Sequence, residues 1–273
     1  MCIIAVKPAG IGLPDYEKIE NMFFANPDGA GLMYTENGSV CIKKGFMTLS
    51  DLDDGLRHLE KQVNVKNTPI ILHFRFSTGG GILPGNTHPF PVVGDIYDLK
   101  KRQISCLLGM AHNGIIPGIK PRKGISDTME YITSELAYIY QSNPCFYKEK
   151  DGKEFLLKRT NSKLAFLDRN GNIETVGHFI EDGGVLYSND SYKSYNYANK
   201  DLMWLNSADH LIVDKDNKIL DAADYYLIDG DGSVYEYDFY LKCALKIVDA
   251  FAITLDGKEA TFVPSKTICK KIY

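Results

Sequence analysis

Short runs of apolar, β-branched residues recur along the chain and predict buried strands. The runs read CIIAV, PIILHFRF and SCLLGMA, and they occupy residues 2–6, 69–76 and 105–111. Between Gly31 and Ile42, the dipeptide Asn37-Gly38 separates two more β-rich segments, which is a strong signal for a two-residue hairpin. We therefore expect antiparallel strands in the first half of the chain.

Other stretches place apolar residues three or four positions apart, the spacing of a helix. One follows Asp15, a second begins at Ser50, which we expect to cap it, and a third runs from Ser126 to Gln141. Strand-like segments separated by glycine turns return over residues 163–187. Helices and hairpins together predict an α+β fold with antiparallel sheets.

The chain has no low-complexity stretch and no linker rich in Pro, Gly or Ser. Site-like polar segments are confined to the first half, whereas the region after about residue 199 contains only further strand-like segments. We expect one main domain over residues 1–199 and a C-terminal extension over residues 200–273 that packs on it.

Composition and charge exclude several classes of function. The net charge of −4 over 273 residues provides no basic footprint for nucleic acid. No apolar run approaches the roughly 20 residues of a membrane span, and the first ten residues lack a secretory pattern, so we expect a cytoplasmic chain. The six cysteines show no metal-binding spacing, and neither a metal nor a cofactor is expected.

Cys2 stands out because it directly follows Met1. Removal of Met1 would leave a thiol and a free α-amine on one residue, and the amine, with a pKa of about 7.7, can accept the thiol proton near neutral pH. Position alone is explained better by a small apolar residue that begins a strand. The nucleophile hypothesis therefore depends on polar residues elsewhere in the chain.

Arg75 ends an apolar strand and is followed by Gly79, Gly80 and Gly81. A guanidinium is costly to bury unless it pairs with a carboxylate, and glycines permit a ligand to approach the backbone closely. Arg75 is thus a candidate for holding a substrate carboxylate. A solvent-facing or ion-paired arginine is the alternative.

Asn113 and Gly114 also follow an apolar strand, and their side-chain amide and backbone N–H can donate two hydrogen bonds to an oxyanion. The same dipeptide is a common turn signal. Asp127 lies at a helix start, where it is stabilised by the dipole or, if it faces a cleft, binds a substrate ammonium. His112 and His88 are expected to be structural, His88 by holding the loop after Pro84-Gly85.

Six short segments occur in the order found in the class II glutamine amidotransferases of the N-terminal nucleophile hydrolase superfamily. The segments are Cys2, Pro27–Gly29, Arg75–Thr78, Asn86–Phe90, His112–Gly114 and Ser126–Asp127. The chain resembles the glutaminase domains of this family, and GVLYSNDSY at residues 184–192 is similar to a segment of free-standing or phage-type members. It departs from the family at Gly79, where His is frequent, and at Ala25-Asn26, where Arg often precedes the turn.

The resemblance implies a four-layer αββα sandwich of two stacked antiparallel sheets. It implies that Cys2 attacks the glutamine side-chain amide, that Asn113 and Gly114 stabilise the oxyanion, and that Arg75 and Asp127 hold the α-carboxylate and the α-ammonium. Thr78 would line the glutamine pocket, and Ser77 would support it.

We therefore expect a glutaminase that forms a γ-glutamyl thioester and releases ammonia and glutamate. The sequence contains no GxxxxGK[ST] nucleotide-binding pattern for a synthase reaction, so a separate ammonia-accepting synthase is the expected partner. Two alternatives stay open. One is a stand-alone hydrolase of another γ-glutamyl or acyl amide, and the other is a non-catalytic binding protein with the same fold.

Overall fold

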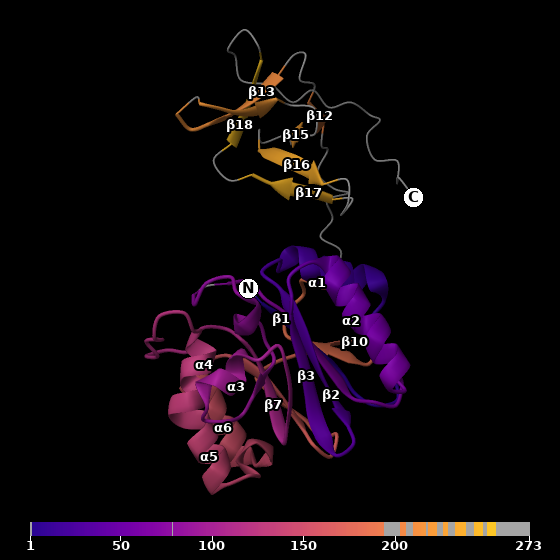
Figure 1. Ribbon diagram of the computed structural model, residues 1–273, viewed down its shortest axis with the longest axis vertical. Coiled ribbons are helices and arrows are strands. Elements are labelled where there is room, and N and C mark those ends of the chain that lie inside the picture. The colour runs from indigo at the N-terminus through magenta and orange to yellow at the C-terminus, as the bar shows by residue number, and fades with distance from the viewer. Residues whose placement is uncertain are drawn as a thin grey trace. The chain divides into compact units, whose positions relative to one another are not determined.

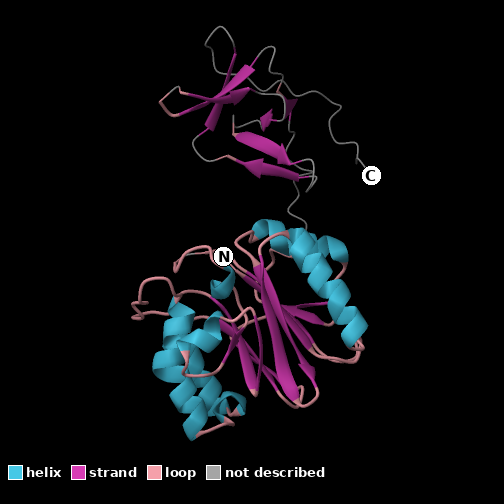
Figure 2. Ribbon diagram, viewed as in Figure 1, coloured by secondary structure: helices cyan, strands magenta, loops and turns pink. Residues whose placement is uncertain are grey.

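The computed structural model describes residues 2–77, 79–193, 203–205, 210–216, 218–222, 226–228, 233–238, 243–247 and 250–254. The chain is mixed α and β, with several antiparallel sheets (Figures 1 and 2). It divides into two compact units, Met1–Tyr195 and Asn196–Tyr273. The expected packing of the C-terminal extension on the first domain stays a prediction.

A seven-stranded antiparallel sheet forms the largest part of the first unit, with the strand order β10-β11-β1-β4-β2-β3-β6. Its strands are β1 (Ile3–Lys7), β2 (Ala30–Glu36), β3 (Ser39–Phe46), β4 (Ile70–Phe74), β6 (Gln103–Cys106), β10 (Ile180–Asp182) and β11 (Val185–Tyr187). The predicted hairpin is confirmed, because β2 and β3 pair around Asn37 and Gly38, whose positive φ values of 49° and 71° suit a tight turn.

The second sheet of this unit has four antiparallel strands in the order β5-β7-β8-β9. They are β5 (Phe90–Pro91), β7 (Leu108–Asn113), β8 (Lys163–Asp168) and β9 (Ile173–Val176). The prediction of one strand over residues 105–111 is wrong, because this run divides between β6 of the large sheet and β7 of the small one. The chain changes sheets at Leu107, which is 53% exposed, and every residue of β7 beyond it is buried.

Helices cover the strands on two sides (Figure 1). The helices α1 (Tyr16–Ala25) and α2 (Leu49–Gln62) lie on one side. On the other side lie α3 (Ile96–Lys100), α4 (Asp127–Tyr131), α5 (Ala137–Ser142) and α6 (Lys150–Thr160). A π-helical segment, Ile132–Leu136, joins α4 to α5, so the helix predicted from Ser126 to Gln141 is confirmed. Short 3₁₀ turns occupy Pro84–Asn86 and Phe146–Lys148.

The start predicted for α2 is wrong, because Thr48 rather than Ser50 caps the helix. The Thr48 hydroxyl accepts a hydrogen bond from the Asp51 backbone at 3.1 Å, and the Asp51 carboxylate accepts one from the Thr48 backbone at 3.2 Å. This reciprocal pair is a capping box, with Asp51 in the position where Glu is more usual. Ser50 lies inside the first turn.

Apolar clusters lie on both faces of the four-stranded sheet of the first unit. One joins the facing sides of the two sheets and contains Ile4, Val6, Met33, Val40, Ile42, Ile71, Ala111, Ala165 and Leu167. The other joins the four-stranded sheet to its helices, and it includes Met110, Leu164 and Phe166 with Met129, Ile132, Leu136 and Leu156. Buried apolar area of this kind is the main favourable contribution to folding.

The second unit is built of strands in its described residues. A four-stranded sheet has the order β12-β15-β16-β17 and a three-stranded sheet the order β14-β13-β18. The strands are β12 (Met203–Trp204), β13 (His210–Asp214), β14 (Ile219–Ala222), β15 (Tyr226–Ile228), β16 (Val234–Asp238), β17 (Cys243–Lys246) and β18 (Ala250–Thr254). Its core contains Leu205, Ile212, Tyr226, Ile228, Val234, Ala250 and Ala252. Across the described part of the chain, no helix is long and apolar enough to cross a membrane.

Candidate functional site

Cys2 lies at the entrance of β1, opposite the end of β4. Ile3 pairs with Phe74, and this register places Cys2 beside Arg75 and Phe76. The Cys2 Sγ accepts a hydrogen bond from the Phe76 N–H at 3.3 Å and donates one to the Phe76 carbonyl at 3.4 Å. Burial raises the pKa of the Cys2 thiol, whereas the hydrogen bond to Phe76 and the positive charge of Arg75 lower it. The net shift is upward, so the thiol needs a base in order to react at neutral pH.

Ser188 and Asn189, which directly follow β11, form hydrogen bonds with Cys2 and with β1. Asn189 donates from Nδ2 to the Cys2 carbonyl at 2.7 Å, and its own Oδ1 accepts from the Ser191 N–H and hydroxyl. Ser188 exchanges two hydrogen bonds with Ile4, one from backbone to backbone and one from Ile4 N to Ser188 Oγ, both 2.9 Å long. Sequence reasoning gave these residues no role. The available signal was a polar run, SNDS, directly after an apolar strand.

Asn113 ends β7, and its side chain reaches the other sheet. Its Nδ2 donates to Ser188 Oγ at 2.9 Å, so Ser188 contacts both Asn113 and the β1 backbone. Gly114 follows with φ +152°, and a Cβ there would lie 2.2 Å from Ser162 Oγ. A side chain at position 114 is therefore excluded by both backbone conformation and space.

Arg75 is 3% exposed, and its guanidinium is held by the loop that follows it. Nη1 donates to the Gly81 carbonyl and Nη2 to the Gly79 carbonyl, each at 2.9 Å. These bonds use two of the five N–H donors of the side chain. Burial lowers the pKa of Arg75, while the negative charges of Cys2, Asp28 and Asp127 raise it. The glycines thus bring loop carbonyls to the guanidinium, a contact that sequence reasoning did not foresee.

Asp28 belongs to the site region, although the sequence indicated only a turn here. Its Oδ2 accepts a hydrogen bond from the Ser77 N–H at 2.6 Å. The turn is joined to Arg75 in both directions, because Arg75 N donates to Gly29 O at 2.9 Å and Asp28 N donates to Arg75 O at 3.0 Å. Ser77 Oγ donates to Gly79 O at 3.3 Å. Thr78, the expected lining residue, lies outside the described residues.

Asp127 lies in the first turn of α4, which Ser126 caps. Its Oδ2 accepts from the Ile116 N–H at 2.9 Å and its Oδ1 from the Thr128 N–H at 2.8 Å. The carboxylate also favours the charged form of Arg75, so it is within electrostatic reach of the guanidinium. A carboxylate and a guanidinium in this relation can bind opposite ends of a zwitterion.

Three buried histidines lie close to Arg75 or Asp127. The rings of His73 and His88 stack with centroids 4.2 Å apart, and His73 Nε2 donates to the His112 carbonyl at 3.0 Å. His112 Nδ1 contacts Thr128 Oγ1 at 2.8 Å. Burial lowers the pKa of His73 to about 3, that of His112 to about 4, and that of His88 well below its usual value. The three rings are therefore neutral at physiological pH and connect β4 to β7.

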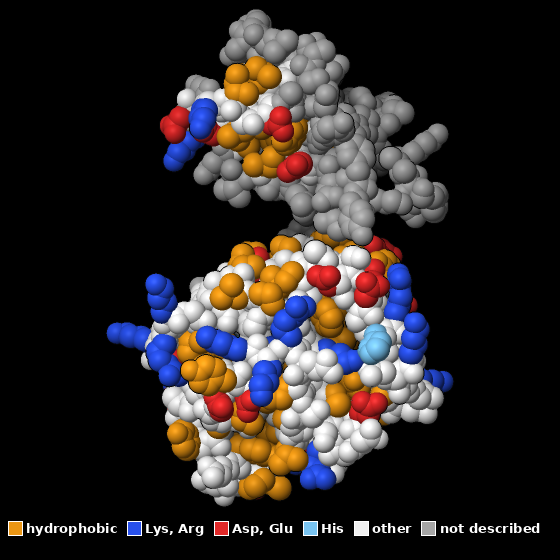
Figure 3. Space-filling model, viewed as in Figure 1, with side chains coloured by type: hydrophobic (Ala, Val, Ile, Leu, Met, Phe, Trp, Pro, Cys, Tyr) orange, Lys and Arg blue, Asp and Glu red, His pale blue; other side chains and the backbone are white. Residues whose placement is uncertain are grey.

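No family model matches the chain, and no curated protein matches it in sequence. Within the described residues, no group of three or more His, Cys, Asp or Glu side chains could hold a metal ion. On the visible face of the first unit, basic side chains are spread among apolar and acidic ones (Figure 3).

Proposed function

We propose that the chain is a glutaminase of the class II amidotransferase type with Cys2 as its nucleophile. The observation that carries this proposal is a pair of hydrogen bonds made by two consecutive residues. Asn189 donates to the carbonyl of Cys2, the candidate nucleophile, and Ser188 accepts from Nδ2 of Asn113, the candidate oxyanion donor. Arg75, the expected partner of a substrate carboxylate, lies next to Cys2, and the negative charge of Asp127, the expected partner of its ammonium, raises the pKa of Arg75. These contacts support a common site made from residues far apart in the sequence.

In the proposed reaction, the thiolate of Cys2 attacks the side-chain carbonyl carbon of glutamine. A carbon–sulfur bond forms, and the electron pair of the carbonyl moves to its oxygen, which Asn113 Nδ2 and the Gly114 N–H stabilise. The tetrahedral intermediate collapses as its nitrogen takes a proton and leaves as ammonia. Water then attacks the γ-glutamyl thioester, which releases glutamate and restores the thiol.

The proton taken from the thiol requires a nearby base. Because burial raises the pKa of the Cys2 thiol, little thiolate would exist at neutral pH without one. The α-amine of Cys2 would serve, directly or through water, once Met1 has been removed. Arg75 would hold the substrate carboxylate, Asp127 its ammonium, and Thr78 would line the pocket.

Two further features belong to the proposal. The apolar cluster that joins the two sheets, with helices on both outer sides, supports the four-layer αββα sandwich implied by the resemblance. The chain would work in the cytoplasm. It would pass its ammonia to a separate synthase, because no nucleotide-binding pattern for a synthase reaction occurs in the sequence.

The deciding experiment combines intact mass with labelling by 6-diazo-5-oxo-norleucine, a glutamine analogue that alkylates a nucleophilic thiol. Protein that has lost Met1 should take up one equivalent at Cys2 and should release ammonia and glutamate from glutamine. Cys2→Ala should abolish both, and Cys41→Ala, which removes another partly buried thiol, should leave both unchanged. Processed protein that neither labels nor hydrolyses glutamine would overturn the proposal.

Substrate profiling separates the other two hypotheses. Turnover of a different γ-glutamyl or acyl amide without glutamine hydrolysis would favour the stand-alone amide hydrolase. Retention of Met1 in active cells, with no reaction of Cys2 toward any amide, would favour the binding protein. Asn189→Ala should slow labelling at Cys2, because it removes the bond that positions the Cys2 carbonyl.

A further inference from the structure

Two loops meet next to the candidate site, and each is connected to one of the residues expected to bind the charges of an amino acid. The loop after β4 supplies the carbonyls of Gly79 and Gly81, which accept hydrogen bonds from the Arg75 guanidinium at 2.9 Å each. The loop before α4 ends at Ser126, which caps the helix that begins with Asp127. The contact between these two loops therefore lies between Arg75 and Asp127.

The two loops approach each other closely at Gly80. A Cβ there would lie 2.7 Å from the Ile125 carbonyl oxygen and 2.9 Å from the Ser126 nitrogen, so a side chain would push the loops apart. Gly80 has φ +77°, and its neighbour Gly81 has a similar φ of +81° but would place a Cβ in open space. The close approach of the second loop thus adds a requirement for glycine at position 80 that position 81 lacks.

Asn86 connects the same two loops. It is 1% exposed, and its Nδ2 donates a hydrogen bond to Gly80 O at 2.6 Å. A longer contact of 3.5 Å joins Nδ2 to Gly124 O. One buried amide group therefore holds the backbone between the two carbonyls that bind Arg75, and it also contacts the backbone three residues before Asp127.

The turn that carries Asn86 is itself held by the large sheet. Asn86 is the last residue of a 3₁₀ turn. The buried Lys44 donates from Nζ to Gly85 O at 3.0 Å. The Gly45 N–H donates to the Thr87 hydroxyl at 2.8 Å. Because both donors belong to β3, Asn86 is supported by a regular element rather than by another loop.

We propose that Asn86 is a positioning residue that fixes the spacing between the Arg75 guanidinium and the Asp127 carboxylate. It would thereby set the preference of the site for substrates that carry both charges of an α-amino acid. A substrate with one charge needs only one of the two loops, whereas a substrate with both needs the loops at the correct separation. This inference rests on the proposed glutaminase activity, because it assigns Arg75 and Asp127 to the two charges of the substrate.

The kinetic test separates substrate positioning from chemistry in the full-length protein. Asn86→Ala should raise KM for glutamine about fivefold or more and change kcat by less than about twofold, because it removes a hydrogen bond that positions the substrate partners and leaves Cys2 and Asn113 in place. Labelling by 6-diazo-5-oxo-norleucine, which carries both charges, should slow to a similar degree. Labelling of Cys2 by iodoacetamide, which carries neither charge, should stay within about twofold.

Two one-charge analogues of glutamine test the spacing directly, as competitors of labelling by 6-diazo-5-oxo-norleucine. The analogue 5-amino-5-oxopentanoate retains the carboxylate, and 4-aminobutanamide retains the ammonium. Their inhibition constants should differ between the parent protein and Asn86→Ala by less than about twofold, because each analogue uses only one loop. A general loosening of the site would instead weaken the analogues and glutamine alike.

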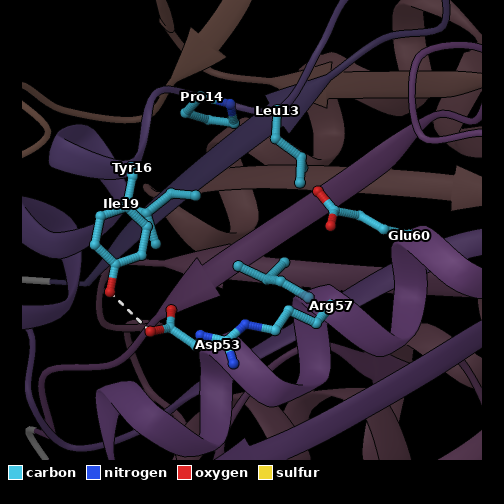
Figure 4. A pocket seen from close by; sticks show the side chains of 8 residues that line it. Leu13, Pro14, Tyr16, Ile19, Asp53, Arg57 and Glu60 are labelled. Carbon is cyan, nitrogen blue, oxygen red and sulfur yellow. Dashed lines mark hydrogen bonds between the residues drawn. The ribbon is translucent and has the colours of Figure 1, made fainter.

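Three further variants provide matched comparisons. Gly80→Ala should raise KM as Asn86→Ala does, and it replaces that variant if Asn86→Ala fails to fold. Gly81→Ala has a similar backbone strain without the contact between the loops, so its effect should be smaller. Tyr16→Phe removes one tertiary hydrogen bond, 2.7 Å long, to Asp53 in a pocket lined by α1 and α2, and it should change neither KM nor labelling (Figure 4).

Backbone hydrogen exchange tests the contact without relying on catalysis. Asn86→Ala should speed exchange of the amides in residues 79–82 and 124–127 together, and Tyr16→Phe should speed neither. A parent protein that neither labels nor hydrolyses glutamine would overturn both proposals. If the parent is active and Asn86→Ala leaves KM unchanged, or speeds exchange in one loop only, this inference is overturned and the proposed function stands.

Discussion

The three neutral histidines give the first unit a specific sensitivity to acid. The Nδ1 of His73, both ring nitrogens of His88 and the Nε2 of His112 are buried without a hydrogen-bond partner among the described residues. Burial disfavours an imidazolium at all three positions, and the positive charge of Arg75 adds repulsion at His73 and His88. The neutral form is therefore the one that the fold accommodates.

From this we predict that stability falls as the pH is lowered. In the unfolded chain a histidine titrates near pH 6.5, whereas His73 and His112 have pKa values of about 3 and about 4 in the folded protein. Between these limits the unfolded state binds more protons, so each histidine should reduce the free energy of unfolding by about 1.4 kcal/mol per pH unit. Urea denaturation at pH 7, 6 and 5 measures this slope.

A pair of variants assigns the effect. His112→Asn should make the stability less dependent on pH, even though it lowers stability at pH 7. His58→Gln, at an exposed position of α2, should leave the slope unchanged. A slope that is the same in both variants would contradict the assignment to the buried rings.

The secondary-structure elements depend on contacts at their ends as much as on their apolar faces. In α2, Leu49, Leu52, Leu56 and Leu59 form the buried face, and the capping box of Thr48 and Asp51 satisfies N–H groups that the helix itself leaves unpaired. The sequence pattern identified the face and missed the cap by two residues. Thr and Ser are both good caps, so only the backbone conformation selects between Thr48 and Ser50.

We predict that Thr48→Ala lowers the free energy of unfolding by about 1 kcal/mol, because it leaves the Asp51 N–H without its partner. Ser50→Ala, also at an exposed position, should change stability by less than about 0.5 kcal/mol. Chemical denaturation of both variants measures the difference. If Ser50→Ala were the more destabilising, the cap would be at the position expected from the sequence.

The helix α6 illustrates an element that periodicity does not reveal. Only Leu156 and Thr160 are buried in it, so the apolar signal is weak. Its Gly152 packs so closely on the preceding 3₁₀ turn that a Cβ there would lie 1.7 Å from the Phe146 carbonyl oxygen. A glycine that lowers helix propensity is thus required by tertiary packing.

At the scale of the whole molecule, the first unit contains the apolar clusters on both faces of its four-stranded sheet and every described residue of the candidate site. It also spans about 195 residues, a size at which a domain buries enough surface to fold alone. The second unit has a separate apolar core.

We therefore predict that residues 1–195 fold without the rest of the chain. The truncated protein should unfold cooperatively and should label at Cys2 at a rate within about twofold of the full chain, since the cores of independent domains are separable. Circular dichroism and the electrophile assay measure these properties. Aggregation of the truncated protein, or loss of labelling, would mean that residues 196–273 support the first unit, as the expected packing of the extension requires.

The sequence by itself determined the local elements and the candidate chemistry. Periodicity found α1, α2 and the long α4–α5 helix, and Asn37-Gly38 located the first hairpin, because these signals depend on neighbours a few residues apart. Cys2, Arg75, Asn113 and Asp127 could be singled out because each has an unusual position relative to a predicted element.

Only the tertiary structure decided which of these residues lie close together and which hydrogen bonds connect them. The run 105–111 divides between two sheets, and the loop carbonyl of Gly81 accepts a hydrogen bond from Arg75. Ser188 and Asn189 form hydrogen bonds with Asn113 and Cys2, which are distant along the chain. No local pattern encodes such contacts, because they depend on sheet order and register. Cys2 is a candidate nucleophile by sequence, and its surroundings are set by β4 and β11, strands that begin at Ile70 and Val185.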